Sequence, residues 1–290
     1  MININGHTSV YGIIGRPIGH TMSPAIHNMI SEAMGIDSVY VPFAANDDLG
    51  SIVRGLFSLG VKGINVTVPY KTDIIYELCG LEQMALDIGA VNTLKYTPNG
   101  YYGYNTDIIG LERELKDERV LLRGRNVVIL GAGGAARAVA FLCASKGAAS
   151  ITIVNRTLNK ALDIRADVAA YANKTGLYQL SSNIYAVTIK EIGSILYDDC
   201  IAFQCTNVGL SPNDDACVVH DLGFYKRVSV GIDLIYKPAN TMFMQYVRSA
   251  GGVSHNGLKM LIYQAVSAYE IWHGVVVPEV VIYDIERSLQ

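Results

Sequence analysis

The sequence lacks the features that mark membrane proteins and nucleic-acid-binding proteins. No apolar run approaches the length that spans a bilayer. The N-terminal residues show neither the basic start nor the apolar core of a signal peptide. The formal net charge is only −3, and no basic stripe runs along the chain. We therefore expect a cytoplasmic protein that binds small molecules and has neither nucleic acid nor a membrane among its partners.

Cysteine is scarce and shows no metal-binding or redox pattern. The count is five, which is odd, no Cys-x-x-Cys occurs, and no histidine is grouped with the cysteines. This argues against a disulfide framework and against a zinc site, so we expect reduced thiols and no metal. Apolar residues, in contrast, make up 50% of the 290 residues, and charged residues only 17%. That composition supports a sizeable core, and the length predicts two domains.

The stretch from residue 126 to residue 157 predicts a nucleotide-binding unit. Its order is strand, glycine turn, helix, strand, and the spacing of Gly131, Gly133 and Ala136 fits the dinucleotide fingerprint G-x-G-x-x-G/A. The first glycine permits a tight turn, and the second lets the backbone approach a pyrophosphate. The phosphates then bind the free N–H groups at the start of the helix. The turn consists of Gly131, Ala132, Gly133, Gly134 and Ala135.

The end of the second strand in this unit indicates which cofactor is bound. An NAD site carries an acid there to bind the ribose 2′-hydroxyl. Here the strand, residues 151–154, runs into Asn155, Arg156 and Thr157, with Lys160 one turn later. A guanidinium suits a 2′-phosphate, which an acid would repel. The sequence therefore favours NADP, and the alternative is that Arg156 is a solvated surface residue.

The apolar runs in the rest of the chain predict an α/β protein with two lobes. Alternating strands and helices in the N-terminal part predict a βαβ domain with a mainly parallel sheet. Two helices follow the nucleotide-binding unit, so the chain is expected to return to the first domain. The prediction is a discontinuous substrate domain, residues 1–107 and 256–290, and a Rossmann-like NADP-binding domain, residues 108–255, with a cleft between them. The expected strands are residues 10–15, 38–43, 63–68, 127–130, 151–154, 200–206 and 228–236, plus a hairpin of 92–96 and 101–104, and the expected helices are residues 24–34, 48–59, 107–116, 135–145, 257–272 and 278–289.

Polar side chains gather where the strands of the first lobe are expected to end. They supply hydroxyls, amides, one ammonium and one carboxylate, which suit a small polyhydroxylated acid. Several have a simpler alternative. Ser23 can cap a helix whose first residue is Pro24, Lys71 can be a solvated residue at a helix start, and Asp107 can be another N-cap. Only the whole set favours a binding site. Its members are Thr21, Ser23, Asn65, Thr67, Lys71, Asn92 and Asp107.

These strand-end residues belong to a series of seven motifs. The motifs are Gly15-Arg-Pro-Ile-Gly-His20-Thr21-Met-Ser23-Pro24-x-x-His27-Asn28, Asn65-Val-Thr67-Val-Pro-x-Lys71, Gly89-Ala-Val-Asn92-Thr93, Gly103-x-Asn105-Thr106-Asp107-x-x-Gly110, Gly131-Ala-Gly-Gly-Ala-Ala-Arg-Ala138 with Asn155-Arg156-Thr157, Asp233-Leu-Ile-Tyr236-x-Pro238, and Gly257-Leu-x-Met260-Leu-x-x-Gln264. Any one of them would be weak evidence. Together and in this order, they resemble the shikimate/quinate dehydrogenase family along nearly the whole chain.

The resemblance implies the reversible reduction of 3-dehydroshikimate to shikimate by NADPH. It implies that Lys71 and Asp107 are the catalytic pair. The implied substrate contacts are Thr21, Ser23, Thr67, Asn92, Tyr236 and Gln264. The implied cofactor contacts are Gly131, Ala132, Gly133, Gly134, Ala135, Asn155, Arg156, Thr157, Lys160, Thr206 and Gly257.

Two departures from the family pattern leave alternatives open. Thr21 stands where the family usually has a second serine, and Lys160 stands where it often has arginine. A quinate/shikimate dehydrogenase that prefers NAD therefore remains an alternative. More distant alternatives are a methylene-tetrahydrofolate dehydrogenase, which would not need Asn105-Thr106-Asp107, and a ligand sensor without turnover. A monomer and a homodimer are both compatible with the sequence.

Overall fold

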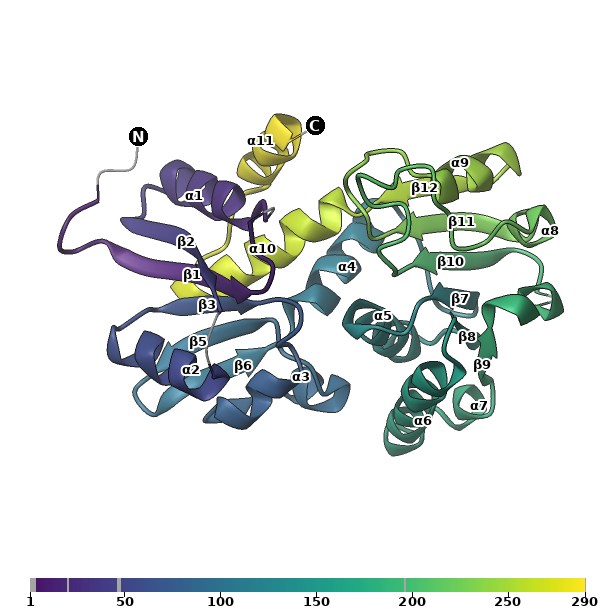
Figure 1. Ribbon diagram of the computed structural model, residues 1–290, viewed down its shortest axis with the longest axis horizontal. Helices are drawn as coiled ribbons and strands as arrows, with labels where there is room; N and C mark the ends of the chain where they lie inside the picture. The colour runs from purple at the N-terminus through teal and green to yellow at the C-terminus, as the bar shows by residue number, and fades with distance from the viewer. Residues whose placement is uncertain (1–3, 20, 46–47, 196, 290) are drawn as a thin grey trace. The chain divides into compact units, whose positions relative to one another are not determined.

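The computed structural model describes residues 4–19, 21–45, 48–195 and 197–289. The chain forms two compact units (Figure 1). The first contains Met1–Gly110 and Leu261–Gln290, and the second contains Leu111–Met260. Both limits fall inside helices, α4 (Thr106–Asp117) and α10 (Leu258–His273). The chain therefore passes between the units twice within continuous helices rather than through loops.

The first unit is built on a six-stranded mixed sheet with the order β2-β1-β3-β5-β6-β4. Strand β1 pairs in parallel with β2 and β3, whereas β5 pairs antiparallel with both β3 and β6. The prediction of a mainly parallel sheet thus holds for the β2-β1-β3 part and for the parallel pair of β4 and β6, but not around β5. The strands are β1 (Ser9–Gly15), β2 (Ser38–Ala44), β3 (Gly63–Val66), β4 (Gly80–Leu81), β5 (Thr93–Thr97) and β6 (Gly100–Tyr104).

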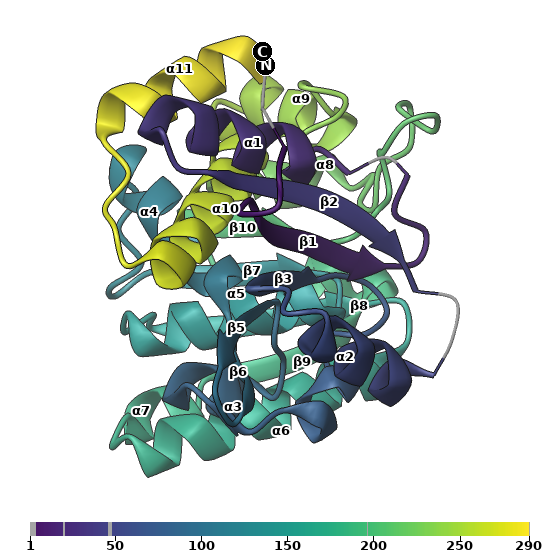
Figure 2. The ribbon, with the colours of Figure 1, turned by 90° about the vertical axis from the view of Figure 1, so that its left-hand side faces the viewer.

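Helices pack on both faces of this sheet. Figures 1 and 2 both show α1 and α2 on opposite sides of it. On one face, Trp272 of α10 contacts Tyr11 and Tyr40. A Cβ at Gly63 would lie 2.4 Å from the Trp272 ring, so only glycine lets the strand approach the indole this closely. The remaining helices are α1 (Ser23–Met34), α2 (Leu49–Ser58), the 3₁₀ helix η1 (Asp73–Glu77), α3 (Gln83–Ile88) and α11 (Glu279–Leu289).

The second unit is built on a six-stranded parallel sheet with the order β12-β11-β10-β7-β8-β9. Its central strands are buried almost throughout, as expected for a parallel sheet covered on both faces. The chain moves outward from β7 to β9 and then restarts at β10, on the other side of β7. Ligands of such sheets bind where this order reverses. The strands are β7 (Asn126–Leu130), β8 (Ser150–Asn155), β9 (Ile184–Thr188), β10 (Cys200–Gln204), β11 (Val228–Asp233) and β12 (Val253–Asn256).

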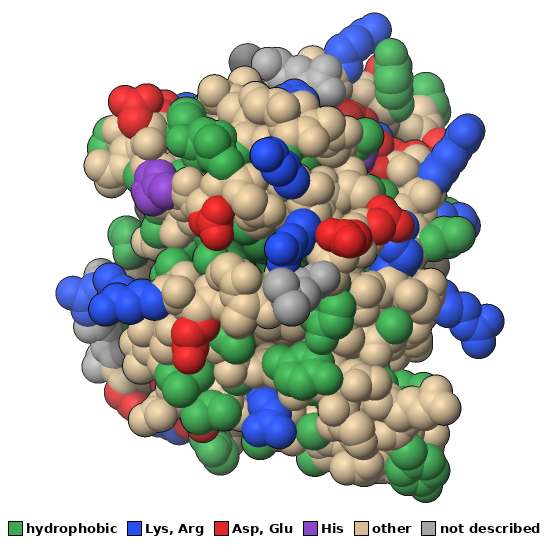
Figure 3. Space-filling model, turned by 90° about the vertical axis from the view of Figure 1, so that its right-hand side faces the viewer, with side chains coloured by type: hydrophobic (Ala, Val, Ile, Leu, Met, Phe, Trp, Pro, Cys, Tyr) green, Lys and Arg blue, Asp and Glu red, His purple; other side chains and the backbone are tan. Residues whose placement is uncertain are grey.

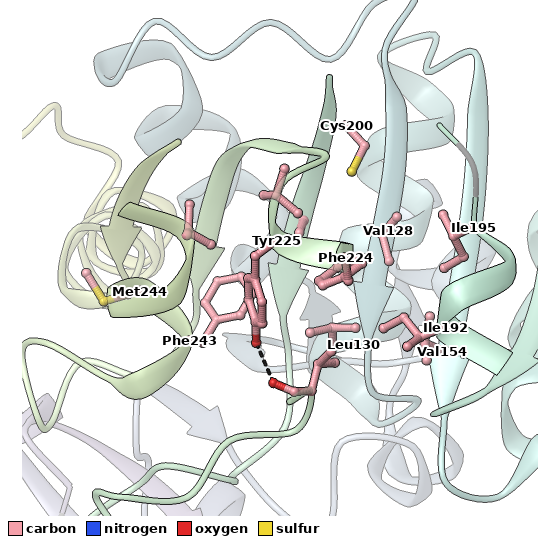
Figure 4. Close-up of a cluster of buried hydrophobic side chains, with 14 residues drawn as sticks. Val128, Leu130, Val154, Ile192, Ile195, Cys200, Phe224, Tyr225, Phe243 and Met244 are labelled. Carbon is pink, nitrogen blue, oxygen red and sulfur yellow. Dashed lines mark hydrogen bonds between the residues drawn. The ribbon is translucent and has the colours of Figure 1, made fainter. Parts of the chain in front are cut away.

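The core of the second unit includes a cluster between the sheet and the helices on one face (Figure 4). Phe224, Tyr225 and Phe243 belong to this cluster together with Val128 and Leu130 of β7. The Tyr225 hydroxyl donates a hydrogen bond to the Val219 carbonyl at 2.8 Å, so this buried aromatic ring keeps its polar end satisfied. The helices are α5 (Gly134–Ser145), α6 (Leu158–Lys174), α7 (Tyr178–Ser181), η2 (Ile189–Ser194), α8 (Leu222–Tyr225) and α9 (Met242–Ser249).

Four features of the described residues bear on possible ligands and partners. None of their helices is long and apolar enough to cross a bilayer, and no group of three or more potential ligands among them is arranged to hold a metal ion. All five cysteines are free thiols. The face drawn in Figure 3 shows basic and acidic side chains interspersed rather than separated by sign.

Candidate active site

Lys71 and Asp107 form a close ion pair in the first unit. The Lys71 Nζ atom donates to Asp107 Oδ2 at 2.6 Å, and the two side chains are 21% and 12% exposed. Lys71 follows the end of β3, and Asp107 lies in the first turn of α4. The simpler alternatives for both residues were wrong. Lys71 is paired rather than solvated, and Asp107 lies inside the helix, where Asn105 accepts the hydrogen bond from the Ile108 N–H.

Asn92 fixes the second oxygen of this carboxylate. Its Nδ2 donates to Asp107 Oδ1 at 2.8 Å. Its Oδ1 accepts from the Thr106 backbone N–H at 2.7 Å and lies 3.1 Å from the hydroxyls of Thr93 and Thr106. A backbone N–H can only donate, so the carboxamide has a single orientation, with its NH₂ toward Asp107. Asp107 therefore accepts one donor on each oxygen.

A buried polar chain behind Asn92 holds it in place. Asn65 Nδ2 donates to the Asn92 carbonyl at 3.1 Å and to Thr93 Oγ1 at 3.0 Å. Asn65 Oδ1 accepts from the Tyr40 hydroxyl at 2.8 Å. The sequence did not predict a role in the site for three of these supporting residues, Tyr40, Thr93 and Thr106. Only the strand register brings Tyr40 to Asn65, and no local pattern indicates that contact.

His27 is excluded as a proton carrier by its surroundings. The imidazole is buried in α1 and stacks on the Tyr40 ring with centroids 4.1 Å apart. Burial lowers the pKa of His27 to about 3, so it is neutral at physiological pH. The other histidine of the opening motif, His20, lies outside the described residues. Among the residues of this site that the structure describes, Lys71 and Asp107 are thus the candidates for proton transfer.

The hydroxyls of Thr21 and Ser23 lie side by side at the start of α1. The prediction that Ser23 caps this helix was wrong, because the N-cap position is Met22 and Ser23 is already helical. The Ser23 N–H donates to Thr21 Oγ1 at 3.3 Å, and the two hydroxyls are 3.2 Å apart. Thr21 therefore accepts the local backbone hydrogen bond, from the Ser23 N–H. The buried Ser23 hydroxyl is consequently not used in capping.

The other predicted substrate residues occupy three separate places. Thr67 follows β3 directly and is half-buried. Gln264 is buried on α10, where a Cβ at Gly110 would lie 2.7 Å from its backbone nitrogen, so Gly110 allows α4 and α10 to approach closely. Tyr236 belongs to the second unit, follows β11, and has a pKa raised by burial. The structure brings Lys71, Asn92 and Asp107 into direct contact but shows no hydrogen bond from Thr67 or Gln264 to them.

The glycine turn of the second unit suits a phosphate group. Gly131 has φ +116°, and a Cβ there would lie 2.9 Å from the Thr206 methyl group, so the turn requires glycine. Helix α5 begins at Gly134, and Gly133 caps it without any side-chain hydrogen bond. No atom lies within 4 Å of a Cβ built at Gly133 or Gly134. The space beside the backbone at this helix start is therefore open, which suits the close approach of an anion to a helix N-terminus.

The residues after β8 carry positive charge only. Arg156 and Lys160 are exposed, and the next acid along the chain is Asp163. Within the described part of the chain, Arg156 makes no hydrogen bond or ion pair with the protein. Thr157 caps α6 without a side-chain bond, and Asn155 Nδ2 bonds the Thr157 carbonyl at 2.8 Å. The set fits a 2′-phosphate, because a free guanidinium lies where an NAD site would have a carboxylate.

The family of this chain follows from its similarity to known proteins. Residues 13–94 match a family model described as shikimate dehydrogenase substrate binding domain. Residues 114–194 match shikimate/quinate 5-dehydrogenase, and residues 257–285 match the shikimate 5′-dehydrogenase C-terminal domain. The chain is 40% identical over 272 residues to shikimate dehydrogenase (NADP(+)) of Methanothermobacter thermautotrophicus, with 93% of each sequence covered. The protein belongs to the shikimate dehydrogenase family.

Solved structures of family members share the whole fold. A crystal structure of shikimate dehydrogenase in complex with NADP+ is 34% identical with a TM-score of 0.88, covering 99% of this chain and 97% of that one. Shikimate 5-dehydrogenase of Thermus thermophilus, solved with NADP(H) and shikimate, is 26% identical with a TM-score of 0.83, covering 98% and 100%. This confirms the predicted fold class, a substrate-binding domain together with a Rossmann-like domain.

Proposed function

We propose that this shikimate dehydrogenase family member catalyses the reversible, NADPH-dependent reduction of 3-dehydroshikimate to shikimate. The observation that carries the proposal is the Lys71–Asp107 pair at 2.6 Å, oriented by Asn92 and left partly open. A reduction of this kind needs a hydride donor and a group that gives a proton to the developing alkoxide. NADPH supplies the hydride when bound. The Lys71 ammonium supplies the proton, and in the oxidation direction the pair accepts it.

The proposed roles divide between the two domains. We assign residues 1–107 and 256–290 to the substrate domain and residues 108–255 to the NADP-binding domain, close to the two compact units. In the substrate domain, hydroxyl and amide groups hold the carboxylate and hydroxyls of shikimate. In the NADP-binding domain, the glycine turn holds the pyrophosphate, and Arg156 with Lys160 holds the 2′-phosphate. The proposed substrate contacts are Thr21, Ser23, Thr67, Asn92, Tyr236 and Gln264.

The test follows the absorbance of the reduced cofactor, NADPH or NADH, with two substrates and two cofactors. We expect turnover of shikimate with NADP+ to exceed turnover of quinate and turnover with NAD+. A preference for quinate with NAD+ would establish the alternative dehydrogenase. Tight binding of shikimate without turnover under any pairing would establish a ligand sensor. The assay thereby separates the two dehydrogenases, and a binding measurement with shikimate in the absence of turnover identifies the sensor.

Thr21 bears on whether quinate is a second substrate. Thr21 lies 3.2 Å from Ser23, at the group proposed to bind the substrate carboxylate. Its methyl group changes the shape of this site while the hydroxyl keeps a donor. Quinate carries an additional hydroxyl on the ring carbon that bears the carboxylate, so the shape of this wall decides whether it fits. Quinate turnover by the native chain and by Thr21→Ser shows directly how the threonine methyl group affects the binding of quinate.

The first kinetic prediction concerns Ser23. Ser23→Ala should raise KM for shikimate about tenfold while changing kcat little, because a carboxylate contact exists in both the ground state and the transition state. The variant should unfold at nearly the native temperature, since Ser23 is not the helix cap. Steady-state kinetics and a thermal melt measure both quantities.

A matched control for Ser23 is Asp48→Ala. The Asp48 side chain accepts from the Ser51 N–H and is the N-cap of α2. Its loss should lower the melting temperature with unchanged kinetics. The reverse pattern for Ser23→Ala, a lower melting temperature with native KM, would show that its hydroxyl is structural.

The second kinetic prediction concerns Arg156. A charge-assisted contact with phosphate contributes about 1.5–3 kcal/mol, so Arg156→Ala should weaken NADP+ binding by roughly tenfold or more. NAD+ binding should change little, because NAD+ has no 2′-phosphate. Arg287→Ala, at an exposed arginine of α11, is the control and should alter neither constant. Equal losses for NADP+ and NAD+ in Arg156→Ala would contradict the assignment.

Two remaining points belong to the same proposal. We place the reaction in the cytoplasm, where the five free thiols would stay reduced. We also propose a monomer or homodimer as the working form. Sedimentation equilibrium of the purified chain distinguishes these states from each other and from larger assemblies.

A further inference from the structure

A buried polar network joins the ends of two central strands in the second unit. Gln204 ends β10 and Asp233 ends β11, and the two residues are register partners. Both side chains are fully buried. Gln204 Nε2 lies 3.3 Å from Asp233 Oδ1, and Thr241, the N-cap of α9, donates to Asp233 Oδ2 at 2.6 Å. We call Gln204, Asp233 and Thr241 the strand-end network.

Gln204 shapes the loop that follows β10. Its Oε1 accepts from the Thr206 N–H at 2.6 Å and the Thr206 hydroxyl at 2.7 Å. Because the backbone N–H only donates, the carboxamide orientation is fixed. Its NH₂ lies 3.1 Å from the Val208 carbonyl, 3.3 Å from the Thr206 carbonyl and 3.3 Å from Asp233. One side chain thus satisfies the backbone of a loop that would otherwise bury unpaired groups.

Asp233 and Thr241 shape the loop that follows β11. Asp233 Oδ1 accepts from the Ile235 N–H at 3.0 Å, and Thr241 Oγ1 accepts from the Met244 N–H at 3.3 Å. All partners of the carboxylate are donors, which suits its ionised form. Burial raises the pKa of Asp233 to about 6, so it is still ionised at neutral pH. The titratable groups that act on it electrostatically, Cys205 and Tyr225, have pKa values raised by burial and are neutral there.

Both loops contact residues that we assign to the cofactor site. A Cβ at Gly131, in the glycine turn, would lie 2.9 Å from the Thr206 methyl group. A Cβ at Gly257 would lie 2.3 Å from the Leu234 carbonyl, and the Gly257 N–H bonds the Ile235 carbonyl at 3.1 Å. The strand-end network therefore holds the two loops that contact Gly131 of the glycine turn and Gly257.

We propose that Gln204, Asp233 and Thr241 are positioning residues for NADP binding, which hold the loops after β10 and β11 in their binding shape before the cofactor arrives. The proposal rests on the proposed function of this domain. None of the three residues needs to touch NADP for this role. Their effect is preorganisation, since a loop that is already ordered loses less entropy on binding.

The experiment uses Thr241→Val, which keeps the side-chain shape and removes the hydroxyl, and Thr241→Ser, which restores it. Gln204→Glu is the second test, because it places a carboxylate oxygen against two carbonyls and Asp233. Calorimetry should show the Kd for NADP+ rising about two- to tenfold in Thr241→Val and more in Gln204→Glu. Thr241→Ser should have a nearly native Kd. Thr152→Val, at a buried threonine of β8 outside the network, should leave the Kd unchanged.

A second readout needs no cofactor. Amide hydrogen exchange at Thr206, Val208 and Ile235 should accelerate in Thr241→Val and Gln204→Glu without NADP+ present, and not in Thr152→Val. A lower melting temperature with native Kd and native exchange would overturn the assignment and leave a merely structural network. If the native chain binds no NADP+, the proposed function falls as well. Native binding with unaffected variants overturns the positioning role alone.

Discussion

Lys71→Ala should lower kcat by about 10²–10⁴-fold, the range that a general acid–base group contributes. The Nζ atom lies 2.6 Å from Asp107 in a site that is only partly exposed, so water is a poor substitute for it. The KM for shikimate should change far less than kcat. Steady-state kinetics in both directions, with the proton donated in one and accepted in the other, measure this effect.

The control for Lys71 is Lys190→Ala at an exposed lysine of η2. It makes the same chemical change away from both proposed sites and should leave kcat and KM native. A Lys71→Ala enzyme that retains nearly full kcat but binds shikimate poorly would contradict proton transfer. Lys71 would then be a binding residue, with the ion pair serving to orient it.

Asp107→Asn should be comparably severe, although it changes only one polar atom for another. Asn92 presents an NH₂ to Asp107 Oδ1, so the new carboxamide will turn its oxygen toward Asn92. Its own NH₂ then faces the Lys71 ammonium, donor against donor. The lysine loses its partner and its orientation, and we expect kcat to fall by about 10²–10⁴-fold.

Combining the two substitutions tests whether the residues act as a unit. Residues that act together give double mutants far less impaired than the product of the single effects. The kcat of the double variant Lys71→Ala with Asp107→Asn should therefore lie within about tenfold of the kcat of the more impaired single variant. Fully multiplicative losses would show independent roles. Asp284→Asn, at an exposed aspartate of α11, is the control and should have native kinetics.

Local sequence patterns predicted much of the second unit correctly. The strand, glycine turn and helix from Asn126 to Ser145 lie where the pattern placed them, because a continuous apolar run for a buried strand and the need for glycine at φ +116° are local constraints. Helix α1 likewise ends at Gly35 in the left-handed conformation. Other elements were not assigned. Strand β12 has only four partly exposed residues, which give too short a pattern to recognise.

The strands expected over residues 200–206 and 228–236 are longer than the observed strands. The strand-end network explains why both end early. Strand β10 stops at Gln204 and β11 at Asp233, although apolar residues continue beyond Asp233. There the carboxylate accepts the Ile235 N–H and competes with the ladder for the backbone. That competition depends on Gln204 and Thr241, so the strand's own pattern could not reveal it.

By itself, the sequence determined which residue types stand at the strand ends, the glycine turn, the absence of an acid after β8, and the family. Each is a matter of local spacing. Only the tertiary structure decided that Lys71 contacts Asp107 across 36 positions, that Thr106 bonds the Asn92 side chain directly, and that Tyr40 supports Asn92 through Asn65. Such contacts follow from the pairing register of distant strands, which long-range hydrogen bonds and core packing select together.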